Sequence, residues 1–295
     1  MKLDDVDGDD FQIEDRRGRG SGGGGLGGGG FRLPIGKGAG GIGAIVMLLI
    51  VAFLGKGMLG GGGSGDGGIG DVLGQLGGGQ TSNLDEVPAS AASTKDAQTQ
   101  FVAQVGSLLT DYWSAQFQGS DQSFQKPGLV VFDAPTQTGG CGVGTPEAGP
   151  FYCPGDQKIY IDFAFYEQLE KQLGFGGDFA MAYVIAHEYG HHIQHLLGIT
   201  DKAGNSNEAS VKVELQADCF AGAWGKSAYE DQRLESGDFD EAINAAKAVG
   251  DDAIQSRTQG RVDRNEWTHG SSADRQKWFK VGFDSGDPSR CDTFA

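Results

Sequence analysis

The chain has 295 residues, enough for a domain with a substantial core, but 53 of them are glycine. The formal net charge of −17 argues against a nucleic-acid-binding protein, because a phosphate backbone is bound through clustered lysine and arginine. More than half of the glycines lie between residues 18 and 79. We therefore expect the folded part to be shorter than the chain.

The first segment, residues 1–37, mixes acidic residues with a basic cluster and the run SGGGGLGGGG. It offers almost no apolar surface to bury, so we predict a disordered tail. The next segment, GAGGIGAIVMLLIVAFLG at residues 38–55, is uncharged and falls at the short end of the roughly 17 to 25 residues that a membrane-spanning helix needs. We predict a single transmembrane helix here, with a secretory signal core or a buried soluble helix as the alternatives.

Basic residues predict the orientation of this helix. Arg19, Arg32 and Lys37 precede it, whereas only Lys56 follows before Lys95. By the positive-inside rule, the N-terminus lies in the cytoplasm and the C-terminal part lies outside it. Residues 56–94 are rich in Gly and Ser and predict a flexible linker, so the chemistry should lie in residues 95–295.

All four cysteines lie in this outer part, and an even number in an oxidising compartment predicts two disulfides. We favour Cys141 with Cys153, which closes a short loop, and Cys219 with Cys291, which attaches the tail to a helix. Free buried thiols are the alternative reading.

Periodicity in residues 95–295 predicts an α+β domain, mostly helical with a small sheet. Helical patterns cover residues 94–117, 162–173, 178–198, 208–229, 240–258 and 272–283, with Asp178 and Ser271 as candidate caps. Strand patterns cover residues 127–135 and the segment QKIYID, residues 157–162.

The segment AHEYGHHIQH contains the pattern H-E-x-x-H. His187 and His191 lie one turn apart on one helical face, so both imidazoles can reach one tetrahedral ion. Glu188 can approach the open position of that ion and take a proton from metal-bound water. Gly190 is costly inside a helix, which indicates that something packs closely there. The alternative to a metal site is a helix whose solvent-exposed face happens to be rich in histidine. The apolar stretch FAMAYVIA before the histidines instead indicates a buried helix.

A catalytic zinc needs a third protein ligand. Gln194 and Leu197 occupy the positions at which the metzincin pattern has Gly and His, so that class is excluded. We predict that His192 and His195 either lie on the surface or support the metal ligands from behind. Downstream, Glu214 and Asp218 lie four apart on one helical face. They can supply one carboxylate for the metal and another that accepts the N–H of a ligating histidine.

These motifs carry a specific resemblance. The H-E-x-x-H helix followed by E-x-x-x-D resembles the gluzincin branch of zinc metallopeptidases. Together with GPFYCPGDQKIYID, ELQADCFAGAW and the C-terminal THGSS and CDTF, it resembles the bacterial family of putative neutral zinc metallopeptidases over about residues 94–295. The resemblance implies a zincin-like fold with one Zn²⁺ per chain, in which His187, His191 and Glu214 are ligands, Glu188 is the general base and Asp218 supports a ligand. It also implies that QKIYID pairs with an extended peptide substrate.

The third ligand has two rivals to Glu214, namely Asp218 and His269. His269 lies just before a helix and could instead stabilise the oxyanion of a tetrahedral intermediate. An equal alternative is that it is a loop histidine with no role in the reaction. Tyr152 and Tyr160 are weaker candidates for the same role.

We therefore predict a single-pass membrane protein whose extracytoplasmic domain hydrolyses peptide or protein substrates. The alternatives are a non-catalytic binding module stabilised by zinc and disulfides, and an amidase that acts on the cell wall. Glu188 favours an enzyme, because a structural zinc site needs no base and fills its fourth position with protein.

Overall fold

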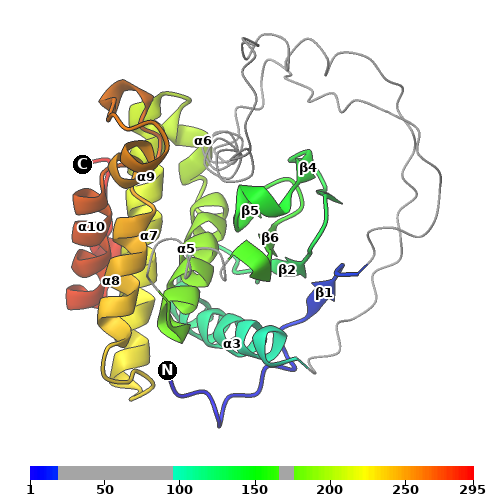
Figure 1. Cartoon of the computed structure of the whole chain (residues 1–295). Coiled ribbons are helices and arrows are strands. Elements are labelled where there is room, and N and C mark those ends of the chain that lie inside the picture. The colour runs from blue at the N-terminus through cyan, green and yellow to red at the C-terminus, as the bar shows by residue number, and fades with distance from the viewer. Residues whose placement is uncertain (19–95, 166–175) are drawn as a thin grey trace, which may run out of the picture.

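The computed structural model describes residues 1–18, 96–165 and 176–295, and it shows a group of helices beside a small sheet (Figure 1). The helices are α3 (Ala97–Phe117), α5 (Asp178–Leu196), α6 (Ile199–Ala203), α7 (Asn207–Glu230), α8 (Asp238–Ala248), α9 (Asp251–Thr258) and α10 (Ser272–Ser285). The strands are β1 (Ile13–Asp15), β2 (Gly128–Val131), β3 (Thr136–Gln137), β4 (Val143–Gly144), β5 (Phe151–Cys153) and β6 (Lys158–Ile161). Short 3₁₀ turns cover Pro146–Ala148, Arg264–Glu266 and Pro288–Arg290. The predicted mostly helical α+β fold is confirmed.

Helix α5 lies at the centre of the domain, in contact with α3, α7, α8 and β5 (Figure 1). Neighbours on several sides explain why its first half is apolar all round. At Gly190 the helix approaches α7 closely, since a Cβ there would lie 3.1 Å from the Cα of Ala217. The close packing predicted at Gly190 is confirmed.

The first turn of α5 is capped from another helix. Gly177 stands at the N-cap position, and the N–H of Phe179 donates to Oε2 of Glu241 on α8 at 3.1 Å. Asp178 is the first helical residue rather than the predicted cap. The predicted cap of α10 is confirmed, because Ser271 accepts from the N–H of Asp274 at 3.0 Å.

The main sheet has the strand order β1-β2-β6-β5, in which β1, β2 and β6 are parallel and β5 is antiparallel to β6. Strand β6 comes from the segment QKIYID and is paired on both sides, which agrees with its buried side chains. The prediction that this segment offers a free edge to a substrate is therefore wrong. Within the described residues the free edge beside α5 belongs to β5.

The N-terminal segment, residues 1–18, is part of the folded domain. Strand β1 pairs with β2, and four apolar side chains of the segment join the main core: Met1, Leu3, Phe11 and Ile13. The prediction of a disordered tail is wrong for these residues. Composition averaged over residues 1–37 hid a local group of five apolar side chains in residues 1–13: Met1, Leu3, Val6, Phe11 and Ile13. The rest of the predicted tail, residues 19–37, lies outside the described residues.

Because β1 pairs with β2, residues 1–18 and the remainder of the domain lie on the same side of any membrane. A single crossing between them would separate the two, so the predicted cytoplasmic N-terminus with an outer domain does not fit this fold. No helix in residues 1–18, 96–165 and 176–295 is long and apolar enough to span a bilayer. The predicted span at residues 38–55 and the linker at 56–94 lie outside these ranges.

The C-terminal half packs as a bundle of α7, α8 and α10, and α7 and α10 approach most closely at two glycines (Figure 1). A Cβ on Gly222 would lie 2.0 Å from the carbonyl oxygen of Phe279, so only glycine fits there. The helix predicted for residues 240–258 is two helices, α8 and α9, which are separated around Gly250. Most of the helix predicted for residues 162–173 lies outside the described residues.

Both predicted disulfides are confirmed. Cys141, in the turn between β3 and β4, bonds to Cys153 at the end of β5, and Cys219 on α7 bonds to Cys291 near the C-terminus. All four cysteines are thereby paired, and no free cysteine is found in the described residues.

Candidate metal centre

Three side chains from two helices meet beside the centre of α5. His187 and His191 project from α5 one turn apart, with ring centroids 4.8 Å from each other, and Glu214 projects toward them from α7. The donor atoms of the three residues all lie within 4.8 Å of one another. Nε2 of His187 lies 3.1 Å from Oε2 of Glu214, and Nε2 of His191 lies 3.4 Å from Oε1. The predicted ligand set is therefore brought together.

The other ring nitrogen of each histidine has its own partner. Nδ1 of His187 lies 2.9 Å from Oδ1 of Asp218, and Nδ1 of His191 lies 2.8 Å from Oε1 of Gln194. Because a carboxylate and an amide oxygen only accept, both Nδ1 atoms donate, so each ring, when it is neutral, carries its lone pair on Nε2. Both lone pairs then face the site of Glu214, and the predicted position of Asp218 behind His187 is confirmed.

This donor set fits a zinc ion. Bonds of about 2.0–2.1 Å at tetrahedral angles place donor atoms about 3.3–3.4 Å apart, close to the two separations between imidazole and carboxylate at 3.1 and 3.4 Å. Two imidazoles and one carboxylate are also the donors of several catalytic zinc sites, in which a fourth position stays open. The residues present are thus suited to hold the metal.

Glu188 shares the same buried region without belonging to the donor set. It is 8% exposed, and burial raises the pKa of its carboxyl, an effect partly offset by His191, His187 and a hydrogen bond from the backbone of Tyr152. The contact with Tyr152 connects Glu188 to β5, the edge strand. A carboxyl with a raised pKa beside a metal site is typical of a general base.

The charges of the candidate ligands depend on one another. Burial alone would raise the pKa of Glu214, but His191 and His187 hold it well below its usual range. Burial alone would lower the pKa of His187, but the neighbouring carboxylates of Asp218 and Glu214 outweigh this effect and raise the pKa to about 9. Glu214 is therefore an ionised carboxylate, which is the form that binds a metal ion.

His269 lies in the loop before α10 and is 6% exposed. Its Nδ1 lies 3.1 Å from Oδ1 of Asp251, and its backbone N–H donates to Oδ2 of the same carboxylate at 2.7 Å. Its Nε2 is buried and has no hydrogen-bond partner among the described residues. His269 is close enough to Glu214 to help lower the pKa of that carboxyl, which places the predicted residue at the edge of the site.

The remaining predicted candidates are used elsewhere. His192 is fully buried rather than on the surface, and it contacts the hydroxyl of Tyr152 at 3.0 Å and the carbonyl of Gln125 at 2.7 Å. Burial lowers its pKa to about 4, so it is a neutral structural residue that holds β5 against α5. Tyr160 donates its hydroxyl to Asp156 at 2.6 Å and faces away from the candidate site into a separate cluster.

Sequence reasoning missed four residues around the site: Gln194, Tyr183, Asp251 and Arg275. Gln194 stood three positions after His191, where it served only to exclude another class of peptidase. Its position on the face of His191 was the one available signal. Arg275 is separated from Asp218 by 57 residues, and no spacing rule reaches that far.

Comparison with known proteins agrees with this geometry. Residues 3–294 match the model of a family described as "Putative neutral zinc metallopeptidase". The chain belongs to this family. The zinc metallopeptidase family match begins within the N-terminal segment, as expected if residues 1–18 belong to the domain.

The chain is similar to two uncharacterized proteins over most of its length. It is 43% identical over 291 residues to the uncharacterized protein YpfJ of Escherichia coli (strain K12), covering 96% of this chain and 95% of that protein. It is 40% identical over 228 residues to the uncharacterized protein Rv2575 of Mycobacterium tuberculosis (strain ATCC 25618 / H37Rv), covering 72% of this chain and 76% of that protein. No solved structure matches the chain.

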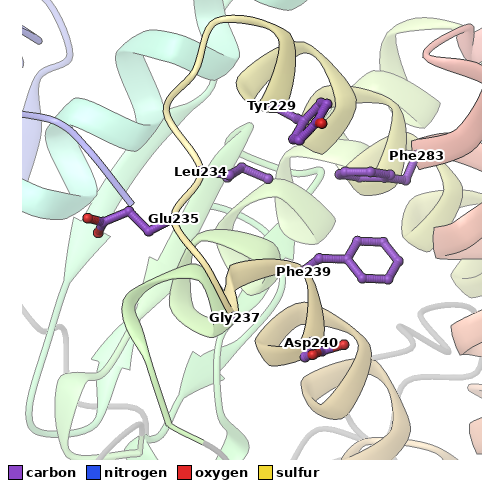
Figure 2. Close-up of a pocket in the computed structure, with 7 residues that line it drawn as sticks. All are labelled: Tyr229, Leu234, Glu235, Gly237, Phe239, Asp240 and Phe283. Carbon is purple, nitrogen blue, oxygen red and sulfur yellow. The ribbon is translucent and has the colours of Figure 1, made fainter.

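A pocket of 370 Å³ lies at the other end of α7 from Glu214, between α7, α8 and α10. Figure 2 shows Tyr229, Phe239 and Phe283 pointing toward one another across it, while the carboxylate of Glu235 points away. It contains none of the candidate metal ligands, so it is separate from the metal centre.

Proposed function

We propose that this member of the zinc metallopeptidase family hydrolyses peptide bonds at the site formed by His187, His191 and Glu214. The observation that carries the proposal is a buried group of two imidazoles and one carboxylate, with a further carboxyl, Glu188, beside it and outside it. A structural zinc site has no use for that extra carboxyl.

A zinc ion held by these three residues would supply a Lewis acid that polarises the substrate carbonyl and makes water more acidic. Glu188 removes a proton from the attacking water as its oxygen bonds to the carbonyl carbon. The same carboxyl then delivers the proton to the amide nitrogen as the C–N bond breaks, so that one water is consumed for each bond. A raised pKa suits a group that must both take and return a proton.

His269 is the proposed donor to the oxyanion that forms on the carbonyl oxygen. Its Nε2 is the buried nitrogen without a partner, and Asp251 accepts from the opposite nitrogen, so Nε2 donates when the ring carries both protons. Three backbone N–H groups, those of Thr268, His269 and Gly270, also donate to Asp251 and fix its carboxylate. A donor held rigidly toward the reacting carbonyl stabilises the transition state more than the substrate.

The decisive experiment compares wild type with Glu188→Gln and Glu214→Ala as full-length chains, because residues 1–18 are part of the fold. Elemental analysis should find about one zinc per chain in wild type and in Glu188→Gln, and markedly less in Glu214→Ala. Hydrolysis of a quenched fluorescent peptide mixture should occur with wild type alone. Loss of zinc from Glu188→Gln would mean that Glu188 is a ligand, and metal binding without hydrolysis of any peptide would favour a binding module.

We also propose that the domain lies outside the cytoplasm, which two disulfides support because they persist in oxidising compartments. Since residues 1–18 fold with it, they would lie outside as well. Single cysteines introduced at exposed Asp4 and Lys277 should then react equally with a membrane-impermeant maleimide on intact cells. Labelling at residue 277 with none at residue 4 would restore the predicted cytoplasmic N-terminus.

A further inference from the structure

Arg275 is a buried cation next to the candidate metal centre. It projects from the first turns of α10 and is only 3% exposed, which is rare for arginine unless its charge is paired. Its Nε donates to Oδ2 of Asp218 at 2.8 Å and its Nη2 donates to Oδ1 at 2.9 Å. The two planar groups therefore meet in the two-bond arrangement that fixes orientation as well as distance.

Asp218 is also the partner of His187. The carboxylate oxygen that accepts from Nη2 of Arg275 is the same Oδ1 that lies 2.9 Å from Nδ1 of His187. Tyr183 donates to this oxygen too. A carboxylate on its own can rotate about its side-chain bonds, but one held through both oxygens cannot turn away from the imidazole.

The guanidinium also lies against the site itself. Nη2 is 3.4 Å from Nδ1 and 3.5 Å from Nε2 of His187, so the guanidinium lies against the imidazole ring. Nη1 is 3.9 Å from Oε2 of Glu214. One fixed cation thus contacts three buried groups of the site: His187, Glu214 and Asp218.

We propose that Arg275 is a positioning residue for the metal centre. It holds Asp218 in the orientation that keeps Nδ1 of His187 as the donor to that carboxylate and leaves Nε2, which faces Glu214, available to bind the metal. The inference rests on the proposed metal site. Lysine would keep the charge but could not make both bonds in the same plane, so Arg275→Lys separates positioning from charge.

The test measures zinc affinity of full-length chains by competition with a chromophoric chelator, for wild type, Arg275→Lys, Asp218→Asn and the double variant. Loss of such a partner of a metal ligand typically weakens metal binding about 10–100-fold, and we expect this for each single variant. If Arg275 acts through Asp218, the double variant should bind no more weakly than the weaker single variant. Arg290→Lys, the same change at an exposed position, should bind as wild type does.

Two outcomes would overturn the inference. The first is a folded Arg275→Lys variant with wild-type zinc affinity and an unchanged absorption spectrum of bound Co²⁺. The second is a double variant whose loss of zinc affinity equals the product of the two single losses. Arg275→Gln takes the place of Arg275→Lys if the latter does not fold. If wild type itself binds no zinc, the proposed function has failed, and ¹⁵N NMR of His187 still tests Arg275. Wild type should show the downfield resonance of an Nδ1 proton bonded to Asp218, Arg275→Lys should lose it, and identical spectra would reject the inference.

Discussion

The two histidines of the metal centre are supported by chemically different surroundings. Behind His187 lies a charged group, in which Asp218 is bound by Arg275 and Tyr183. Behind His191 lies a chain of neutral amides: Gln194 accepts from the imidazole and donates to Gln216 at 3.0 Å, and Gln216 donates to the carbonyl of Cys291 at 2.8 Å.

The difference decides how each side should respond to change. Buried charges are costly to leave unpaired, so removing one member of the His187 side leaves the others without compensation. A buried amide without a partner costs less, because no full charge is desolvated. We therefore expect any single substitution on the His187 side to cost much of the unfolding free energy, and substitutions on the His191 side to cost less each.

The largest effect is expected for Asp218→Ala, which leaves the guanidinium of Arg275 buried and unpaired. Breaking a buried ion pair in this way costs about 3–5 kcal/mol of unfolding free energy. Urea unfolding of the metal-free protein measures it. Asp284→Ala removes an exposed ion pair with Lys280 and should cost less than about 1 kcal/mol. Equal costs for the two variants would contradict the contrast between buried and exposed charge.

The second-largest effect is expected from removing the disulfide between Cys219 and Cys291, which supports the His191 side. Replacing Cys219 and Cys291 with alanine removes a cross-link with a sequence separation of 72 residues and should cost about 2–4 kcal/mol. It should also weaken zinc binding, because the carbonyl of Cys291 holds Gln216. The matched control replaces Cys141 and Cys153, which are 12 residues apart, and should cost less stability. The same loss of zinc affinity in both variants would rule out this route to His191.

A smaller loss is expected for Gln194→Leu, which keeps the approximate side-chain volume and removes the amide. His191, Gln216 and the carbonyl of Val213 each lose a partner. Leaving such groups unpaired costs about 1–3 kcal/mol. Denaturant unfolding, with zinc affinity measured alongside, tests whether the loss stays below that of Asp218→Ala. A greater loss of unfolding free energy than in Asp218→Ala would contradict the expectation that buried amides are less costly to leave unpaired than buried charges.

Residues of the metal centre could be predicted because helical spacing is a local property. His187 and His191 share a face by their separation of four, as do Glu214 and Asp218, whatever the rest of the chain does. Arg275 could not be predicted, because its importance arises only when α10 packs on α7 and brings it to a carboxylate 57 residues away.

The prediction for the N-terminal segment is wrong for a related reason. Composition averaged over residues 1–37 describes a polar, glycine-rich chain, yet β1 forms from three residues that find their partner more than a hundred positions later. A strand gains its stability from the neighbour with which it pairs, and sequence alone does not identify that neighbour. The free edge was assigned to β6 rather than β5 for the same reason.

Arg17 in this segment offers the smallest and sharpest comparison, because it repeats the chemistry of Arg275 near solvent. It pairs with Asp15 and with Asp96, each at 2.7 Å, but its side chain is 25% exposed and that of Asp96 is 43% exposed. Arg17→Met should therefore cost no more than about 1 kcal/mol, far below the cost of leaving Arg275 unpaired.

The pH dependence of this pair gives an independent check. Burial raises the pKa of Asp96, but Arg17 and Thr99 outweigh it and lower the value to about 2. A carboxyl whose pKa is depressed by folding contributes stability above its unfolded pKa of 3.8 and loses that contribution as the pH falls toward 2. The difference in unfolding free energy between wild type and Arg17→Met should thus be constant above pH 5 and shrink below pH 4. If it persisted undiminished at pH 2, the guanidinium would act through packing on Phe163, over which it lies at 5.2 Å, and burial alone would not explain the contrast with Arg275.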